Sequence, residues 1–164
     1  MGTSFIYLHP NAGVAPSDNP ALWKRADDTN QDKPVIEYAD GVTENYDWSL
    51  TIPGDYVSGG TLRLYWRANS ATTNSVRWSV QAISRADNES SDAAFNAADA
   101  ANFANASATA NIVNIDTLVL TNGITGWAVS EELFVRISRI GADAGDTMAA
   151  AAQLLNAVLE YQNA

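Results

Sequence analysis

The residues able to carry acid–base or nucleophilic chemistry are few in this 164-residue chain. There is no cysteine, which excludes disulfides, thiolate metal sites, iron–sulfur clusters and cysteine nucleophiles. The one histidine, His9, cannot supply a two-histidine zinc motif, and no G-x-S-x-G nucleophile turn accompanies it. We therefore interpret His9 as a surface or interface residue, and we expect no catalytic residue, no cofactor and no metal ligand.

Acidic side chains are numerous but lie mainly in polar, turn-like segments. Two carboxylates could hydrolyse a glycoside if the pKa of one were raised, and about six to eight oxygens could bind calcium. The segment Asp87–Asp92 lacks the spacing and the glycine of an EF-hand loop. Turn capping is the favoured role, with a glycosidase and a structural calcium ion as less favoured alternatives. The carboxylates considered are Asp27, Asp28, Asp40, Asp87, Glu89, Asp92, Asp143 and Asp146.

The overall charge excludes some classes of partner. The chain has 19 acidic and 9 basic side chains and a net charge of -10. A surface with this negative charge repels nucleic-acid phosphates and anionic lipids. We therefore expect neither nucleic acid nor a membrane as partner. No apolar run reaches the ~20 residues of a bilayer-spanning helix.

An alternation of apolar and polar residues dominates the chain from residue 45 onward, and it predicts strands with one buried face. Two of these runs, 61–68 and 75–84, are separated by a short polar segment, and we expect them to be neighbouring antiparallel strands. Further strands are expected at 4–9, 34–39, 45–52, 112–120 and 133–140. Seven or eight strands with regular turn signals predict an all-β fold, an antiparallel β-sandwich of jelly-roll type.

Two segments are ambiguous. Residues 92–110 combine alanine with several asparagines, and we expect a short helical turn at 92–98 followed by irregular chain. Residues 147–161 have helical propensity, but a final strand at 154–161 would complete the sandwich and is favoured.

The first 33 residues differ from the rest of the chain. They hold three of the five prolines and many polar side chains. We therefore predict an extended N-terminal arm over residues 1–33 and a sandwich over residues 34–164.

Candidate binding residues are cations and aromatics. Arg63, Arg67, Arg77 and Arg136 occupy polar faces of expected strands, where pairing with acids is favoured over a binding face that would include Tyr65. Trp23 lies beside Lys24 and Arg25, and it either anchors a partner or covers its own sandwich. Three tryptophans on expected strands, Trp48, Trp66 and Trp78, fall on apolar faces and are expected in the core.

The strand segments carry a resemblance to a known family. The segments are WSLTIPGDY at 48–56, GGTLRLYWRA at 59–68, SVRWSVQA at 75–82, LFVRISR at 133–139, ADAGDT at 142–147 and LLNAVLEY at 154–161. Together they resemble small jelly-roll virion structural proteins of tailed bacteriophages.

The resemblance implies a non-enzymatic capsid decoration (cement) protein. Such a protein would bind the major capsid protein on the outer surface of a phage head, after synthesis in the host bacterial cytoplasm, as a homotrimer. The expected contact residues are Trp23, Lys24, Arg25, Arg63, Tyr65, Arg67 and Arg77. The alternative is a carbohydrate- or receptor-binding β-sandwich module of a phage tail, and a glycan-cleaving enzyme is a third, weaker hypothesis.

Overall fold

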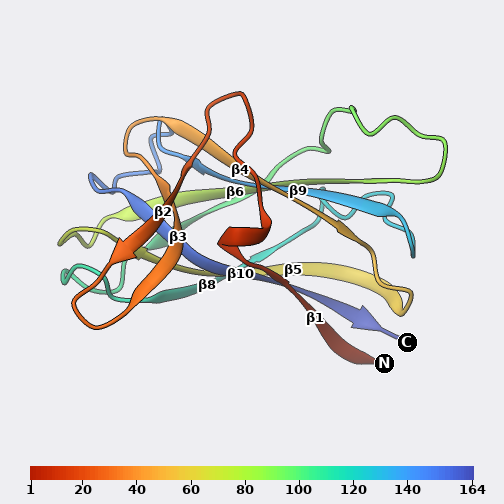
Figure 1. The fold of residues 1–164 in the computed structure, drawn as a ribbon, viewed down its shortest axis with the longest axis horizontal. Helices are drawn as coiled ribbons and strands as arrows, with labels where there is room; N and C mark the ends of the chain where they lie inside the picture. The colour runs from red at the N-terminus through yellow and green to blue at the C-terminus, as the bar shows by residue number, and fades with distance from the viewer.

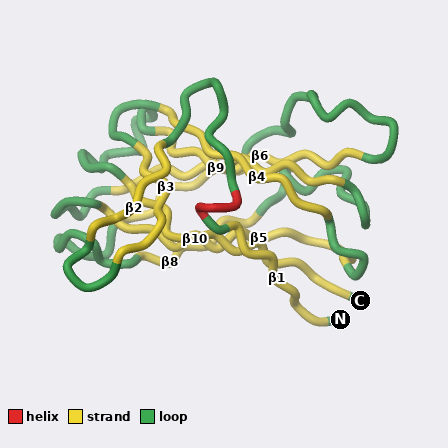
Figure 2. Tube along the Cα trace, viewed as in Figure 1, coloured by secondary structure: helices red, strands yellow, loops and turns green.

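A computed structural model describes all residues, 1–164, and contains ten strands and one short 3-10 helix. The strands form two antiparallel sheets, and from β3 onward the chain crosses repeatedly between them, as in the jelly-roll type of sandwich. Figure 1 shows the two layers, and Figure 2 shows the loops gathered mainly at the two ends of the sandwich. The elements are β1 (Gly2–Leu8), η1 (Pro10–Ala12), β2 (Leu22–Asp27), β3 (Asp32–Tyr38), β4 (Thr43–Thr51), β5 (Tyr56–Ala68), β6 (Ser75–Arg85), β7 (Asp99–Ala104), β8 (Asn114–Val119), β9 (Glu132–Ile140) and β10 (Ala152–Asn163).

The two sheets differ in size. The six-stranded sheet, called sheet A, has the order β2-β3-β10-β5-β8, and β1 pairs with the C-terminal part of β10. The four-stranded sheet, called sheet B, has the order β4-β9-β6-β7. The predicted antiparallel β-sandwich is therefore confirmed. No helix of the fold has the length and apolar character needed to span a bilayer.

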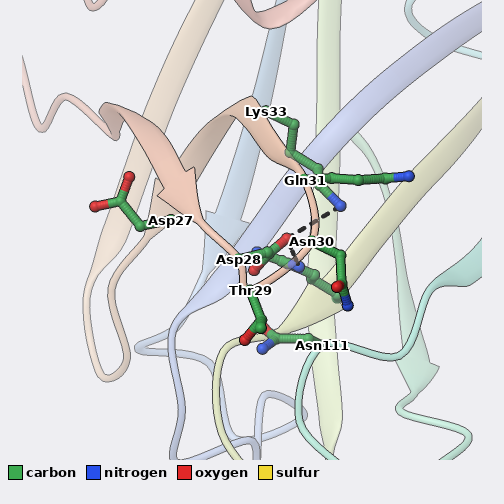
Figure 3. Close-up of a pocket in the computed structure, with 8 residues that line it drawn as sticks. Asp27, Asp28, Thr29, Asn30, Gln31, Lys33 and Asn111 are labelled. Carbon is green, nitrogen blue, oxygen red and sulfur yellow. Dashed lines mark hydrogen bonds and ion pairs between the residues drawn. The ribbon is translucent and has the colours of Figure 1, made fainter.

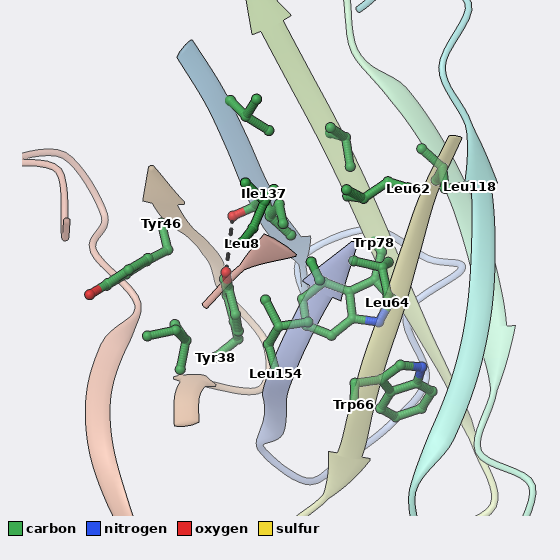
Figure 4. Close-up of a cluster of buried hydrophobic side chains, with 14 of the residues drawn as sticks. Leu8, Tyr38, Tyr46, Leu62, Leu64, Trp66, Trp78, Leu118, Ile137 and Leu154 are labelled. Carbon is green, nitrogen blue, oxygen red and sulfur yellow. Dashed lines mark hydrogen bonds between the residues drawn. The ribbon is translucent and has the colours of Figure 1, made fainter. Parts of the chain in front are cut away.

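The core lies between the sheets and is built from the apolar positions of the alternating runs. Trp66 of β5 and Trp78 of β6 are fully buried and meet edge to face, with ring centroids 6.2 Å apart. Figure 4 shows these rings with leucines of sheet A and with Ile137 of sheet B. Trp48 is 3% exposed. All three tryptophans expected in the core are there.

The prediction that the runs 61–68 and 75–84 pair as neighbouring strands is wrong. The first run belongs to β5, which pairs with β8 and β10, and the second belongs to β6, which pairs with β7 and β9. The polar segment between them crosses from one sheet to the other. The apolar faces of the two runs pack against each other across the core, and this buries both faces.

The C-terminal segment is the strand β10, as expected, and not a helix. It lies inside sheet A, with β5 on one side and β3 and β1 sharing the other. A register shift between Leu154 and Asn156 accommodates this change of partner. Because β10 hydrogen-bonds along both edges, its sequence of leucine, alanine and glutamine adopts the strand despite its helical propensity.

Residues 1–33 do not form a separate extended arm. β1 pairs with β10 over seven residues, and β2 pairs with β3 over six. Val14 and Pro20 bridge to β4, and Ala21 is buried in the core. The polar composition reflects strands at the rim of the sandwich, where much of each side chain stays in water.

The helical turn expected at 92–98 is also absent. These residues form irregular chain that packs on the outer face of sheet B, where Phe95 lies over the Arg136 guanidinium at 4.8 Å. The strand β7 follows within the segment expected to be irregular. At its start, the Asp99 side chain accepts hydrogen bonds from the backbone N–H groups of 121–123.

One buried ion pair organises the loop before β10. Arg139 and Asp146 both have fully buried side chains, and Arg139 Nη2 lies 2.7 Å from the carboxylate. The guanidinium also donates to the carbonyls of Met148 and Ala150. The loop carbonyls therefore find donors inside the core.

Candidate functional site

A polar pocket lies at the turn between β2 and β3. Its volume is about 480 Å³, and none of its eight lining residues is hydrophobic. Figure 3 shows the turn folded around it, with Asp27 pointing away from the other side chains. The lining residues are Asp27, Asp28, Thr29, Asn30, Gln31, Lys33, Arg67 and Asn111.

Arg67 forms the fixed floor of this pocket. It occupies an outward position of β5, yet its side chain is only 4% exposed, because the β2–β3 turn folds over it. Its two terminal nitrogens donate to the Asp28 carboxylate at 2.8 and 3.0 Å. Its Nε donates to Gln153 at 2.8 Å. A bidentate pair with a further hydrogen bond holds the guanidinium in one orientation.

The network extends across the outer face of sheet A. Gln153 donates to Glu37, which also accepts a short hydrogen bond from Lys24. At the other end, Lys33 lies 3.0 Å from Asp28. A polar chain therefore runs from β2 over β3, β10 and β5 and returns to the turn. Such a connected network makes the pocket rigid before any ligand binds.

The charges of the network also set its pKa values. The hydrogen bond from Arg67 and then that from Lys33 lower the pKa of Asp28 below its ordinary value of 3.8. Burial acts to raise the pKa of Glu37, but the hydrogen bonds from Lys24 and Gln153 together outweigh it and lower that pKa. Both carboxylates are ionised at neutral pH, so neither is poised as a general acid.

Acid is expected to loosen the turn at Asp28. Because the pKa of Asp28 is lower in the folded state than in the unfolded state, its ionised carboxylate stabilises the fold. This stabilisation is complete at pH values above the unfolded-state pKa, and it is lost as the pH falls through the folded-state pKa. The difference in unfolding free energy between the wild type and Asp28→Asn should therefore narrow below pH 3.8. Urea unfolding of both proteins from neutral pH to about pH 2 measures this. An unchanged difference over that range would show that the Asp28 carboxylate does not titrate against Arg67.

Trp23 lies on the opposite face of the β2–β3 hairpin from Lys24 and the Arg67 network, on a smaller hollow of about 190 Å³. Its side chain belongs to β2, is 48% exposed, and donates from Nε1 to Asn11 at 2.9 Å. Lys33 lines both hollows. The two hollows and Trp23 together are called the hairpin site below. Its chemistry combines an exposed, anchored aromatic ring with a rigid set of donors and acceptors.

Only some of the sequence-predicted contact residues meet at the hairpin site. Trp23, Lys24 and Arg25 lie on β2, and Arg67 is linked to Lys24 through Gln153 and Glu37. Arg25 pairs with Asp27 and Asp32 at the rim.

Arg63 and Tyr65 lie farther along β5 on the same outer face, where Arg63 pairs with Glu160 at 2.6 Å. Arg77 belongs to sheet B and pairs with Asp143 at 3.4 Å. The expected pairing of the arginines with acids is confirmed, whereas a single arginine face is wrong.

Sequence reasoning missed most of the pocket. Asp28 was considered only as a carboxylate, and Glu37, Gln153 and Asn111 received no role. The available signal was the run DDTNQDK at 27–33, whose polar residues lie between two segments with strand character.

The remaining candidates have structural surroundings. His9 is exposed and stacks on Tyr7 with ring centroids 5.9 Å apart. Asp143 and Asp146 bind Arg77 and Arg139 within the chain. No three acidic or histidine side chains converge on a point that could hold a metal ion.

Comparison with known proteins identifies the fold class alone. No family model and no curated protein matches the chain. A family 35 carbohydrate binding module from Clostridium thermocellum is similar in structure, with a TM-score of 0.55, 13% identity, and coverage of 95% of this chain and 97% of that one. The K1 cleaved adhesin domain of Lys-gingipain from Porphyromonas gingivalis W83 has a TM-score of 0.53, 15% identity, and coverage of 98% and 99%. The chain therefore shares the β-sandwich fold of these modules.

Proposed function

We propose that this protein is a non-catalytic carbohydrate-binding β-sandwich module that binds its glycan at the hairpin site. The observation that carries the proposal is that one hairpin carries both the exposed ring of Trp23 and a wholly polar, rigid pocket, with Lys33 lining the hollows of both. A sugar ring has apolar C–H faces and a rim of hydroxyls. It therefore needs both an aromatic surface and paired donors and acceptors.

The pocket supplies both hydrogen-bond acceptors and hydrogen-bond donors for the hydroxyls of a sugar. Asp28, Asn30 and Gln31 provide carboxylate or amide oxygens, and Lys33 and the amide nitrogens provide donors. Ligand sites are commonly largely preformed, with a few fixed polar groups that set orientation. The Arg67 network gives this pocket that character. The sandwich shared with the family 35 module is consistent with the proposal, although a likeness at 13% identity concerns only the fold.

Neutral glycans are the expected ligands. The two aspartates of the lining are balanced by Lys33 and Arg67, and the whole chain carries a net charge of -10. An anionic polysaccharide would meet repulsion and no unpaired cation.

Affinity electrophoresis through gels containing neutral or acidic polysaccharides tests the proposal. We expect retardation by at least one neutral polysaccharide, less by acidic ones, and no release of reducing ends during incubation. A folded protein that no glycan in a broad panel retards would refute carbohydrate binding. Release of reducing ends would make the protein an enzyme.

The capsid hypothesis stays a prediction. It names the major capsid protein as partner, a homotrimer as the assembly and the phage head as the location. Co-sedimentation with purified heads or tails is the measurement that decides it. Deletion of residues 11–33 does not test it, because this deletion removes β2 and the segment that bridges to β4.

A further inference from the structure

We propose that the outer edge of β8 is an interface between two copies of this chain, which pair β8 with β8 in antiparallel fashion. β8 is the last strand of sheet A and has β5 on one side only. An unprotected edge strand is a template for another strand. Two other edges are protected: β2 carries charged side chains, and Val14 and Pro20 bridge to β4.

The backbone of β8 is arranged for this pairing. Leu120 donates its N–H to the Gly60 carbonyl of β5 at 2.8 Å. Because these groups alternate in direction along a strand, those of Ile115, Thr117 and Val119 point away from β5. No backbone hydrogen bond from a loop uses them. Three consecutive outward positions are therefore open to a partner strand.

The side chains favour a second copy as that partner. In an antiparallel pair centred on Thr117, Ile115 of each copy lies opposite Val119 of the other, and the two Thr117 residues face each other. Ile115 is 58% exposed and Val119 is 65% exposed, so both would gain cover. β-branched residues opposite one another stabilise a sheet. The row is self-complementary, as a twofold interface requires.

The alternative register is less favourable. A pair centred on Asp116 would place the two Asp116 carboxylates opposite each other, although each already accepts a hydrogen bond from Trp66 Nε1 at 2.7 Å. Like charges directly opposite destabilise a sheet pair. The register centred on Thr117 avoids this contact and uses all three open positions.

The net charge of the chain predicts how the dimer responds to salt. Two copies that each carry a net charge of -10 repel one another, while the outward side chains of β8 carry no charge. β8 is thus an edge along which the copies can approach without adding local repulsion. Salt screens the overall repulsion, so the dimer should tighten as ionic strength rises. An interface held by ion pairs would weaken instead.

Light scattering coupled to size exclusion, over a range of concentration and salt, tests the proposal. We expect the mass to rise from 17.5 kDa toward twice that value and to stop there, because a twofold contact closes. Added salt should lower the concentration at the midpoint. A monomer under all conditions, a trimer, or open-ended growth would each overturn the proposal.

Three variants locate the interface. Thr117→Glu sets two carboxylates opposite each other and should abolish the dimer, whereas Thr117→Val keeps a β-branched residue and should retain it. Phe5→Glu places the same charge on the uncharged edge strand β1 and should also retain the dimer. Circular dichroism confirms that each variant is folded. A dimer that survives Thr117→Glu, or that is lost with Phe5→Glu, would place the interface elsewhere.

Discussion

Replacing Trp23 with alanine is expected to weaken glycan binding about 10- to 100-fold, the loss typical of an aromatic anchor at a binding hot spot. The ring is 48% exposed and is oriented by Asn11, so its removal takes away a preset apolar surface without opening the core. Isothermal titration calorimetry with the polysaccharide fragment that binds best measures the change.

Two control variants make this result specific. Trp23→Tyr keeps a flat ring, and it should lose only a few-fold in affinity. Phe5→Ala removes a ring of similar exposure, 51%, from β1, which lies outside the hairpin site, and it should bind as the wild type does. Equal losses for Phe5→Ala and Trp23→Ala would contradict the assignment of the site.

Replacing Arg139 with alanine is expected to cost about 3–5 kcal/mol of unfolding free energy, because it leaves the Asp146 carboxylate buried without its counter-ion. The variant also leaves the Met148 and Ala150 carbonyls without the hydrogen bonds that the guanidinium donates to them. Urea unfolding measures the loss. The glycan site should keep its affinity in the folded fraction, because Arg139 lies outside the hairpin site.

The same strand offers a matched control. Arg136 pairs with Asp47 at 2.8 Å on the outer face of sheet B, where both side chains are about one-fifth exposed. Arg136→Ala should cost less than Arg139→Ala, because water still reaches both side chains of this pair. In addition, Arg139→Met combined with Asp146→Asn should lose less than the two single changes added together, since neither charge is then left alone. A loss for Arg139→Ala no larger than that for Arg136→Ala would contradict the role of the buried pair.

The alternation of apolar and polar residues predicts which side chains face the core of the sandwich. It does not predict which strands pair, because that depends on contacts between distant parts of the chain. Alternation placed Trp66 and Trp78 in the core correctly, because the side-chain period of a strand follows from its backbone geometry. It could not show that β5 and β6 belong to different sheets, since both a hairpin and a crossover bury the same faces. Arg139 illustrates the same limit. Its alternation places it inward, and only the folded loop brings Asp146 to it.

The hairpin site was predictable in its residue types and not in its assembly. Trp23 and Arg67 were candidates because aromatics and arginine are common at binding sites. Their place on one hairpin site depends on the turn after β2 reaching β5, where Arg67 contacts Asp28, a residue 39 positions away in the sequence. Gln153 is farther still, 86 positions from Arg67, and nothing in its local sequence marks it as the partner.

The central claim is that glycan binds at the hairpin site, and a nitrogen–proton NMR titration of the wild-type protein tests it most directly. The chain has five tryptophans, so five indole N–H signals report on different places at once. Saturating neutral glycan should shift the Trp23 indole signal and the backbone amides of 27–33, while the buried Trp66 and Trp78 indoles stay in place. A titration in which the shifts appear elsewhere and leave Trp23 and residues 27–33 unchanged would contradict the assignment of the glycan site.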